Sequence, residues 1–100
     1  MTRIRIVLPH HLRELAEVES PVELEVADPP TLAGALDALE AALPVLKGTV
    51  RDHGSGARRA YLRFYACGRD LSHDPLDTEL PPEVVEGGEP LRVLGAISGG

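Results

Sequence analysis

The sequence ends in a diglycine, Gly99–Gly100, directly after the segment "LRVLGAIS". Glycine has no Cβ, so a diglycine adopts backbone conformations closed to other residues and can enter a slot one chain wide. The reactive group on such a tail is the carboxylate of Gly100. We therefore expect the tail to enter the active site of another protein; a chance pair of glycines or a cloning linker are the alternatives.

This carboxylate needs activation before it can react. Nucleophilic attack on a free carboxylate adds charge to an anion, so the group must first become an acyl phosphate or adenylate. Attack by sulfur then gives a thiocarboxylate, whereas attack by an amine gives an amide or isopeptide bond. The sequence leaves open whether Gly100 carries sulfur or is joined to lysines of target proteins.

The histidines and the cysteine do not form a recognisable site in the sequence. His10 and His11 are adjacent and have no fixed mutual geometry, and His53 and His73 are distant, so no metal site is expected. Cys67 has no nearby histidine or basic helix end that would lower its pKa, so it is interpreted as structural.

Acidic residues gather in the second half of the chain. Asp70, Asp74 and Asp77 lack the spacing of an EF-hand, so they predict a solvated turn. The glutamates between residues 79 and 89 are interpreted as surface that could guide docking onto a basic partner. Since no nucleophile–base pair or pair of catalytic acids is visible, the chain is not expected to be an enzyme itself.

Composition limits the class of protein and its partners. The length of 100 residues predicts one domain, and 43% hydrophobic residues with only 3% aromatics predict an aliphatic core. The net charge of −6 disfavours nucleic acid and anionic membranes, and Arg58–Arg59 is the only candidate basic patch. A single cysteine, and the lack of an apolar leader or membrane-length segment, predict a cytoplasmic protein.

Hydrophobic periodicity predicts the elements that would position the tail. Alternation with period two predicts strands in four segments: 3–9, 22–26, 60–66 and 91–97. Leucines at spacings of four, three and four predict a helix in "TLAGALDALEAALP", with Thr31 as N-cap and Pro44 ending it.

The connecting segments give weaker patterns. Segment 10–21 is predicted to be irregular, and a short turn is predicted over 45–52. Segment 53–60 has the composition of an exposed loop, and segment 71–90 predicts a single helical turn and a tight turn at Gly87–Gly88.

This order of elements predicts the fold class α+β. A β-grasp accommodates it, with a mixed four- to five-stranded sheet and one main helix packed on one face. The last strand is then central and parallel to the first. We therefore expect a domain over residues 1–95 and a flexible tail over 96–100 that leaves from the middle of the sheet.

The same residues resemble a known family. The ending "LRVLGAISGG" resembles that of the ThiS/MoaD-type sulfur carriers, ubiquitin-like proteins in which an apolar strand leads to a diglycine. "IRIVLPHHLRE" resembles their first strand and loop, and "YLRFYACGRDLS" their third strand and turn. Together with the leucine helix, the resemblance covers essentially the whole chain.

The resemblance implies a role as protein cosubstrate. An E1-like adenylyltransferase would use ATP to adenylate Gly100, a sulfur donor would convert it to a thiocarboxylate, and a synthase would accept the sulfur. The chain would bind no cofactor itself. Residues implied in partner binding are Gly99, Ser98, Ile97, Ala96, Leu94 and Arg92.

Two departures from the family's sequence pattern, together with the chain length, favour some members of the family over others. Cys67 stands where asparagine is frequent, and Gly95 where proline is frequent, which argues against molybdopterin synthase in particular. The chain length and the long loop before the third strand favour the longer carriers of cysteine biosynthesis. Thiolation of natural products, the molybdenum cofactor, conjugation to lysines through Gly100, and a plain β-grasp interaction domain remain alternatives.

Overall fold

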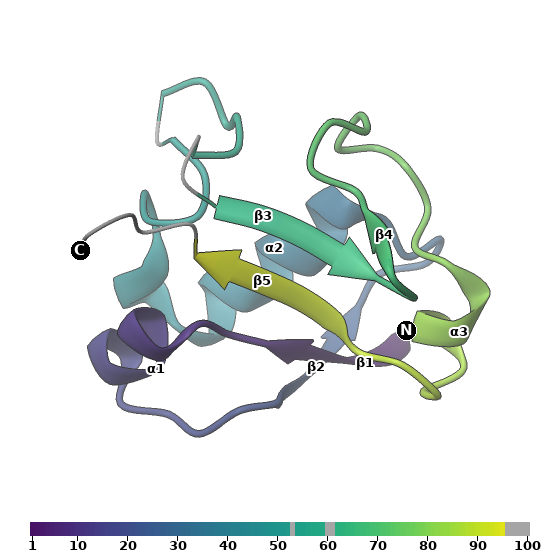
Figure 1. The fold of residues 1–100 in the computed structure, drawn as a ribbon, viewed down its shortest axis with the longest axis horizontal. Helices are drawn as coiled ribbons and strands as arrows, with labels where there is room; N and C mark the ends of the chain where they lie inside the picture. Colours follow the sequence, from purple (N-terminus) through teal and green to yellow (C-terminus); the bar gives the residue numbers. More distant parts are fainter. Residues whose placement is uncertain (53, 60–61, 96–100) are drawn as a thin grey trace.

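The structure, a computed structural model, describes residues 1–52, 54–59 and 62–95. In this part of the chain five strands form one mixed sheet in the order β2-β1-β5-β3-β4 (Figure 1). The strands are β1 (Thr2–Val7), β2 (Val22–Val26), β3 (Leu62–Ala66), β4 (Arg69–Asp70) and β5 (Leu91–Gly95). The predicted α+β class and mixed sheet are confirmed, at the upper end of the expected strand number.

The last strand, β5, occupies the centre of the sheet. It pairs in parallel with β1, where Ile6 is opposite Leu91, and antiparallel with β3, where Phe64 is opposite Val93. β1 pairs with its first two residues, Leu91 and Arg92, and β3 pairs with it as far as Gly95, which fixes the position and direction of its end. The predicted central, parallel placement of the final strand is confirmed.

One helix, α2 (Leu32–Ala42), crosses behind the sheet in Figure 1. Its N-cap is Thr31, whose hydroxyl oxygen accepts a hydrogen bond from the backbone N–H of Gly34 at 3.0 Å. Leu36 and Leu39 are fully buried on its inner stripe. The helix ends before Pro44, which opens the short 3₁₀ helix η1 (Pro44–Leu46), so the predicted helix and both of its ends are confirmed.

The core between α2 and the sheet is aliphatic, as its composition predicts. Alternate residues of each central strand point into it, and Phe64 is the one buried aromatic side chain in the described chain. The inward residues of the sheet are Ile4, Ile6, Leu24, Val26, Leu62, Phe64, Ala66, Leu91 and Val93. The opposite face of the sheet is left open to solvent, since α2 packs on the inner face alone.

The irregular structure predicted for segment 10–21 is wrong at its start. Residues His10–Ala16 form helix α1, which follows Pro9 and ends at Glu17, whose φ of 55° lies in the left-handed region. The helix has seven residues, of which only Leu12 is fully buried. It is therefore too short to show the repeated apolar spacing by which a longer helix is predicted. Packing against the core, rather than local pattern, stabilises it.

Segment 71–90 follows its prediction, whereas the two-residue strand β4 was not predicted. The single helical turn expected in segment 71–90 is α3 (Pro82–Val85), and Gly87 turns the chain towards β5 with a φ of 87°. In the part of the chain that the structure describes, no helix combines the length and the hydropathy that crossing a bilayer requires.

Candidate functional site

The candidate site lies where β5 ends at Gly95. The predicted reactive residue Gly100, and the tail residues that precede it (Ala96, Ile97, Ser98 and Gly99), lie outside the described residues. The structure does place the point from which they follow, which is the end of the central strand (Figure 1).

Arg92 and Leu94, the two predicted partner-binding residues within β5, lie on the open face of the sheet. Both are exposed, and Leu94 keeps 41% of its surface accessible. Across the strands, Tyr65 is opposite Arg92 and Arg63 is opposite Leu94. This end of the open face therefore combines aliphatic, aromatic and guanidinium groups beside the root of the tail.

The end of β5 also contacts α1, which sequence reasoning missed. A Cβ placed on Gly95 would lie 2.9 Å from Cε1 of His11, closer than side chains approach one another. Glycine inside a strand pattern is a known sign of such a close approach, and that was the one available signal. His11 was considered in the sequence only as a metal ligand, because its helix was not predicted.

The acidic stretch and the tail lie at opposite ends of β5. Glu83, Glu86 and Glu89 precede the strand, on and after α3, whereas Gly95 closes it (Figure 1). These glutamates, which are near the tail in the sequence, are interpreted as surface that could guide docking onto a basic partner. A strand of five residues separates them by about 15 Å, so they do not belong to the surface around Gly95.

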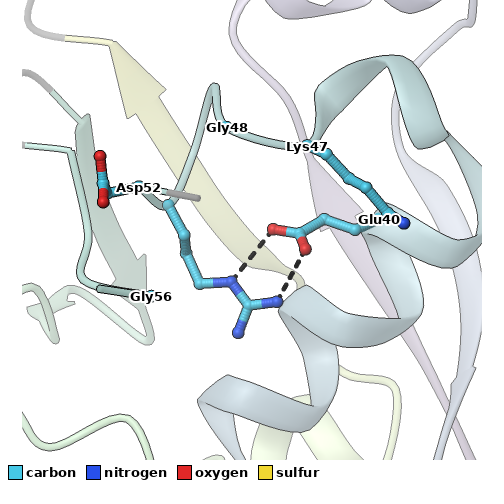
Figure 2. A pocket seen from close by; sticks show the side chains of 6 residues that line it. Glu40, Lys47, Gly48, Asp52 and Gly56 are labelled. Carbon is cyan, nitrogen blue, oxygen red and sulfur yellow. Dashed lines mark hydrogen bonds and ion pairs between the residues drawn. The ribbon is translucent and has the colours of Figure 1, made fainter. Parts of the chain in front are cut away.

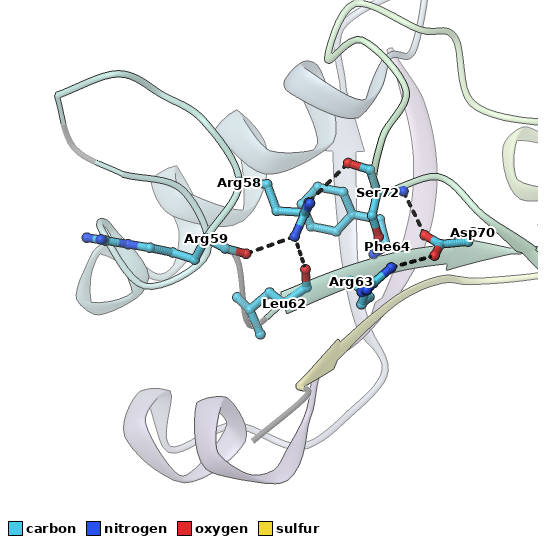
Figure 3. Close-up of polar contacts among 7 residues, drawn as sticks. All are labelled: Arg58, Arg59, Leu62, Arg63, Phe64, Asp70 and Ser72. Carbon is cyan, nitrogen blue, oxygen red and sulfur yellow. Dashed lines mark hydrogen bonds and ion pairs between the residues drawn. The ribbon is translucent and has the colours of Figure 1, made fainter. Parts of the chain in front are cut away.

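The candidate basic patch, Arg58 and Arg59, donates hydrogen bonds to backbone carbonyls of this chain. Arg58 donates from Nε to the carbonyl of Ser72 at 3.0 Å and from Nη1 to the carbonyl of Leu62 at 2.6 Å (Figure 3). Arg59 donates from Nε to the carbonyl of Gly48 at 2.8 Å. Both guanidinium groups therefore hold loops together, which gives no support to a nucleic-acid site.

Asp70, at the end of β4, accepts hydrogen bonds from Ser72 and Arg63 (Figure 3). The backbone N–H of Ser72 lies 2.9 Å from Oδ1, and Nη1 of Arg63 lies 3.0 Å from Oδ2. Hydrogen bonds from Ser72, with Arg63 adding to them, lower the pKa of Asp70 from 3.8 to about 2. The turn that was predicted to be solvated is therefore held by hydrogen bonds from Ser72 and Arg63 to Asp70.

This lowered pKa predicts a pH dependence of stability. Because the folded pKa of Asp70 is below its ordinary value, the charged carboxylate stabilises the fold above pH 3.8, and this contribution is lost as pH falls towards about 2. We expect the urea midpoint of wild type to exceed that of Asp70→Asn at pH 6, and the two to converge near pH 2. Parallel midpoint curves over this range would contradict the assignment.

A polar hollow near the end of α2 is lined by an ion pair. Arg51 donates from Nε and Nη2 to the carboxylate of Glu40 at 3.0 and 2.9 Å (Figure 2). Its Nη2 also donates to the carboxylate of Asp37 at 2.8 Å. The hydrogen bond to Glu40, with Asp37, raises the pKa of Arg51. These groups brace the loop before β3 against α2 and are not free to bind a ligand.

Cys67 occupies a tight turn, as its structural interpretation predicts. Its φ is 54° and that of Gly68 is 76°, the pair of positive values that favours asparagine followed by glycine in hairpins. The turn therefore forms with cysteine where the family often has asparagine. Partial desolvation and the Glu83 carboxylate raise the pKa of the thiol, the opposite of what activates a nucleophile.

No metal centre is formed by the residues that the structure describes, since no group of three or more metal-ligating side chains gathers there. His10 pairs with Glu14 on the exposed side of α1, and His53 lies outside the described residues.

Comparison with known proteins gives a fold relationship. No family model and no curated protein matches the sequence. SAMP1 from Haloferax volcanii superposes with a TM-score of 0.76 at 24% identity, over 98% of this chain and 99% of that one. SAMP1 from Methanosarcina acetivorans gives a TM-score of 0.74 at 21% identity, over 100% and 98%.

A chain in the crystal structure of the BexX/CysO complex of Amycolatopsis orientalis is also similar. It gives a TM-score of 0.71 at 20% identity, over 96% of this chain and 98% of that one. These likenesses confirm the predicted ubiquitin-like β-grasp, and the expected resemblance to ThiS/MoaD-type carriers holds at the level of the fold.

Proposed function

We propose that this protein is a sulfur carrier whose Gly100 is adenylated by an E1-like enzyme and then converted to a thiocarboxylate. The observation that carries the proposal is the central placement of β5, parallel to β1, after which the sequence continues with three residues and then the diglycine Gly99–Gly100. The likeness to small modifier proteins and to a chain of the BexX/CysO complex supports it.

The geometry suits delivery of a carboxylate to a distant pocket. Five residues beyond Gly95 can span up to about 17 Å when extended, enough to reach an active site that the folded body cannot enter. The base of this span is held by β3, which pairs with β5 as far as Gly95. The folded domain then acts as a handle, with Arg92 and Leu94 facing the partner beside the tail.

The proposed reaction has two steps with balanced chemistry. The Gly100 carboxylate attacks the α-phosphate of ATP, which forms the acyl adenylate and releases pyrophosphate. Hydrosulfide from a sulfide donor then attacks the acyl carbon, AMP leaves, and Gly100 carries the thiocarboxylate. The thiocarboxylate passes its sulfur to an accepting synthase in the biosynthesis of cysteine, a thiolated natural product or the molybdenum cofactor.

A second candidate is a protein modifier. The similar proteins from Haloferax volcanii and Methanosarcina acetivorans are small archaeal modifier proteins, which favours conjugation of Gly100 to lysines of targets. Adenylation of the terminal glycine is common to both routes, and only the nucleophile that displaces AMP differs. The domain itself supplies no catalytic residue in either route.

Intact-mass spectrometry tests the proposal directly. The protein is incubated with the E1-like enzyme of the same genome, ATP and a sulfide donor, and we expect the mass to rise by the replacement of one oxygen with sulfur. The control omits ATP. An unchanged mass in the complete mixture, with the tail intact and the enzyme active, would contradict the sulfur-carrier proposal. A target protein that gains the mass of the whole chain would favour the modifier.

A further inference from the structure

The first turn of α1 stands beside the last residue of β5. Strand β1 ends at Val7, which is opposite Arg92, and the chain then enters α1 through Pro9. Beyond Arg92, β5 therefore loses β1 as its neighbour on that side. At Gly95, the atoms nearest the position that a Cβ would occupy belong to His11 and Pro9, and alternation along β5 puts this position on the same face of the sheet as Val93.

Gly95 is confined by β3 and by the first turn of α1. It pairs with Leu62 of β3 within the sheet. A Cβ at position 95 would project from a face of the sheet and would lie 2.9 Å from Cε1 and 3.5 Å from Nδ1 of His11, and 3.6 Å from Cβ of Pro9. The imidazole thus packs directly on the backbone of the residue from which the tail follows.

The His11 ring is partly buried, and it is the end of a flexible side chain. Its Nε2 atom is buried and forms no hydrogen bond with any residue that the structure describes. A methyl at position 95 would therefore push the ring away from Gly95, and the packing of the ring on this residue would be lost. Gly95 therefore has a local reason to be glycine, which is the presence of His11.

From this contact we infer that His11 is a positioning residue for the tail. By packing on Gly95, it fixes the direction in which the chain leaves β5 and thus the approach of Gly100 to the activating enzyme. The inference rests on the proposed function, because the approach matters only if Gly100 is activated. His11 itself touches neither ATP nor the reacting carboxylate.

A double-mutant cycle tests the contact. Gly95→Ala should lower kcat/KM for adenylation about tenfold, because the added methyl displaces the His11 ring and redirects the chain. His11→Ala should raise KM several-fold and leave kcat unchanged, since the exit is loosened and the chemistry is intact. In the His11→Ala background, Gly95→Ala should add almost no further loss, because the nearest remaining contact is Pro9 at an ordinary 3.6 Å.

Two matched variants serve as controls. His10→Ala removes the adjacent, exposed histidine of the same turn, and Gly88→Ala adds a methyl where the nearest atom is an ordinary 3.7 Å away. Both should keep wild-type kcat/KM. Thermal midpoints of all variants identify any loss that is due to unfolding. Equal costs of Gly95→Ala in the two backgrounds would overturn the role of His11.

A measurement on the free protein separates this inference from the proposed function. We expect ¹⁵N relaxation to show a lower order parameter for the Gly95 amide in His11→Ala, and an unchanged one in His10→Ala. An unchanged Gly95 order parameter in His11→Ala overturns the inference whatever the enzyme does. Failure of wild type to be adenylated, with the relaxation result as expected, overturns the proposed function alone.

Discussion

Deletion of Gly100 is expected to abolish adenylation. The new carboxylate, on Gly99, would lie one residue back along the chain, a retreat of about 3.5 Å for an extended tail. Reacting atoms must approach to about 3–3.5 Å in a productive complex, and a misplacement of 1 Å can cost about 100-fold. We therefore expect at least a 100-fold fall in kcat/KM. ATP–pyrophosphate exchange with the E1-like enzyme measures it.

A matched substitution separates the effect of tail length from any effect on folding. Gly100→Ala keeps the length of the tail and adds one methyl, so it tests whether the slot admits a Cβ, and we expect a smaller loss than from the deletion. The thermal midpoint of both variants should match wild type, because Val93 is the last buried residue in the part of the chain that the structure describes. If the deletion variant were adenylated as fast as wild type, Gly100 would not be the reactive residue.

The elements that were predicted correctly are those whose own residues show a complete hydrophobic period. Strand β2 alternates over its full length, with Leu24 and Val26 inward and Glu23 and Glu25 exposed. Helix α2 has a capping residue, a leucine stripe and a proline after its end, three independent signals that agree. Local agreement of this kind fixes an element before tertiary contacts are known.

The elements that were missed depend on tertiary contacts. Helix α1 has one fully buried residue, Leu12, so its stabilising contacts lie elsewhere in the chain and leave no period in the sequence. Strand β4 has two residues and exists through its pairing with Tyr65 and Ala66 of β3. Neither length nor pattern could have predicted these two elements.

The candidate site also has one part that the sequence predicts and another part that depends on tertiary contacts. The diglycine, and the exposure of Arg92 and Leu94, follow from sequence alone, because strand alternation assigns the faces. The contact between His11 and Gly95 joins residues 84 positions apart in the sequence, since 95 − 11 = 84, and depends on the parallel pairing of β1 with β5. Sequence adjacency was misleading for the glutamates on α3, because a strand separates them from the tail.

Arg58→Met is expected to destabilise the fold by about 3 kcal/mol, because it leaves three backbone carbonyls without their charged donor. Those carbonyls belong to Arg59, Leu62 and Ser72, so one guanidinium joins the loop before β3, the start of β3 and the segment after β4 (Figure 3). Methionine retains much of the aliphatic length, so the change isolates the polar contacts. Urea denaturation at pH 7 measures the free energy of unfolding.

Arg69→Met provides the matched control for this prediction. Arg69 is exposed on β4, and its guanidinium forms no hydrogen bond or ion pair within the described chain, so the same substitution there should change stability by less than about 0.5 kcal/mol. Both variants remove one positive charge, and only Arg58→Met also removes the hydrogen bonds to the three backbone carbonyls. Equal effects of the two would refute the structural role of Arg58. If Arg58→Met instead kept full stability and lost affinity for a labelled oligonucleotide, the basic-patch interpretation would be correct.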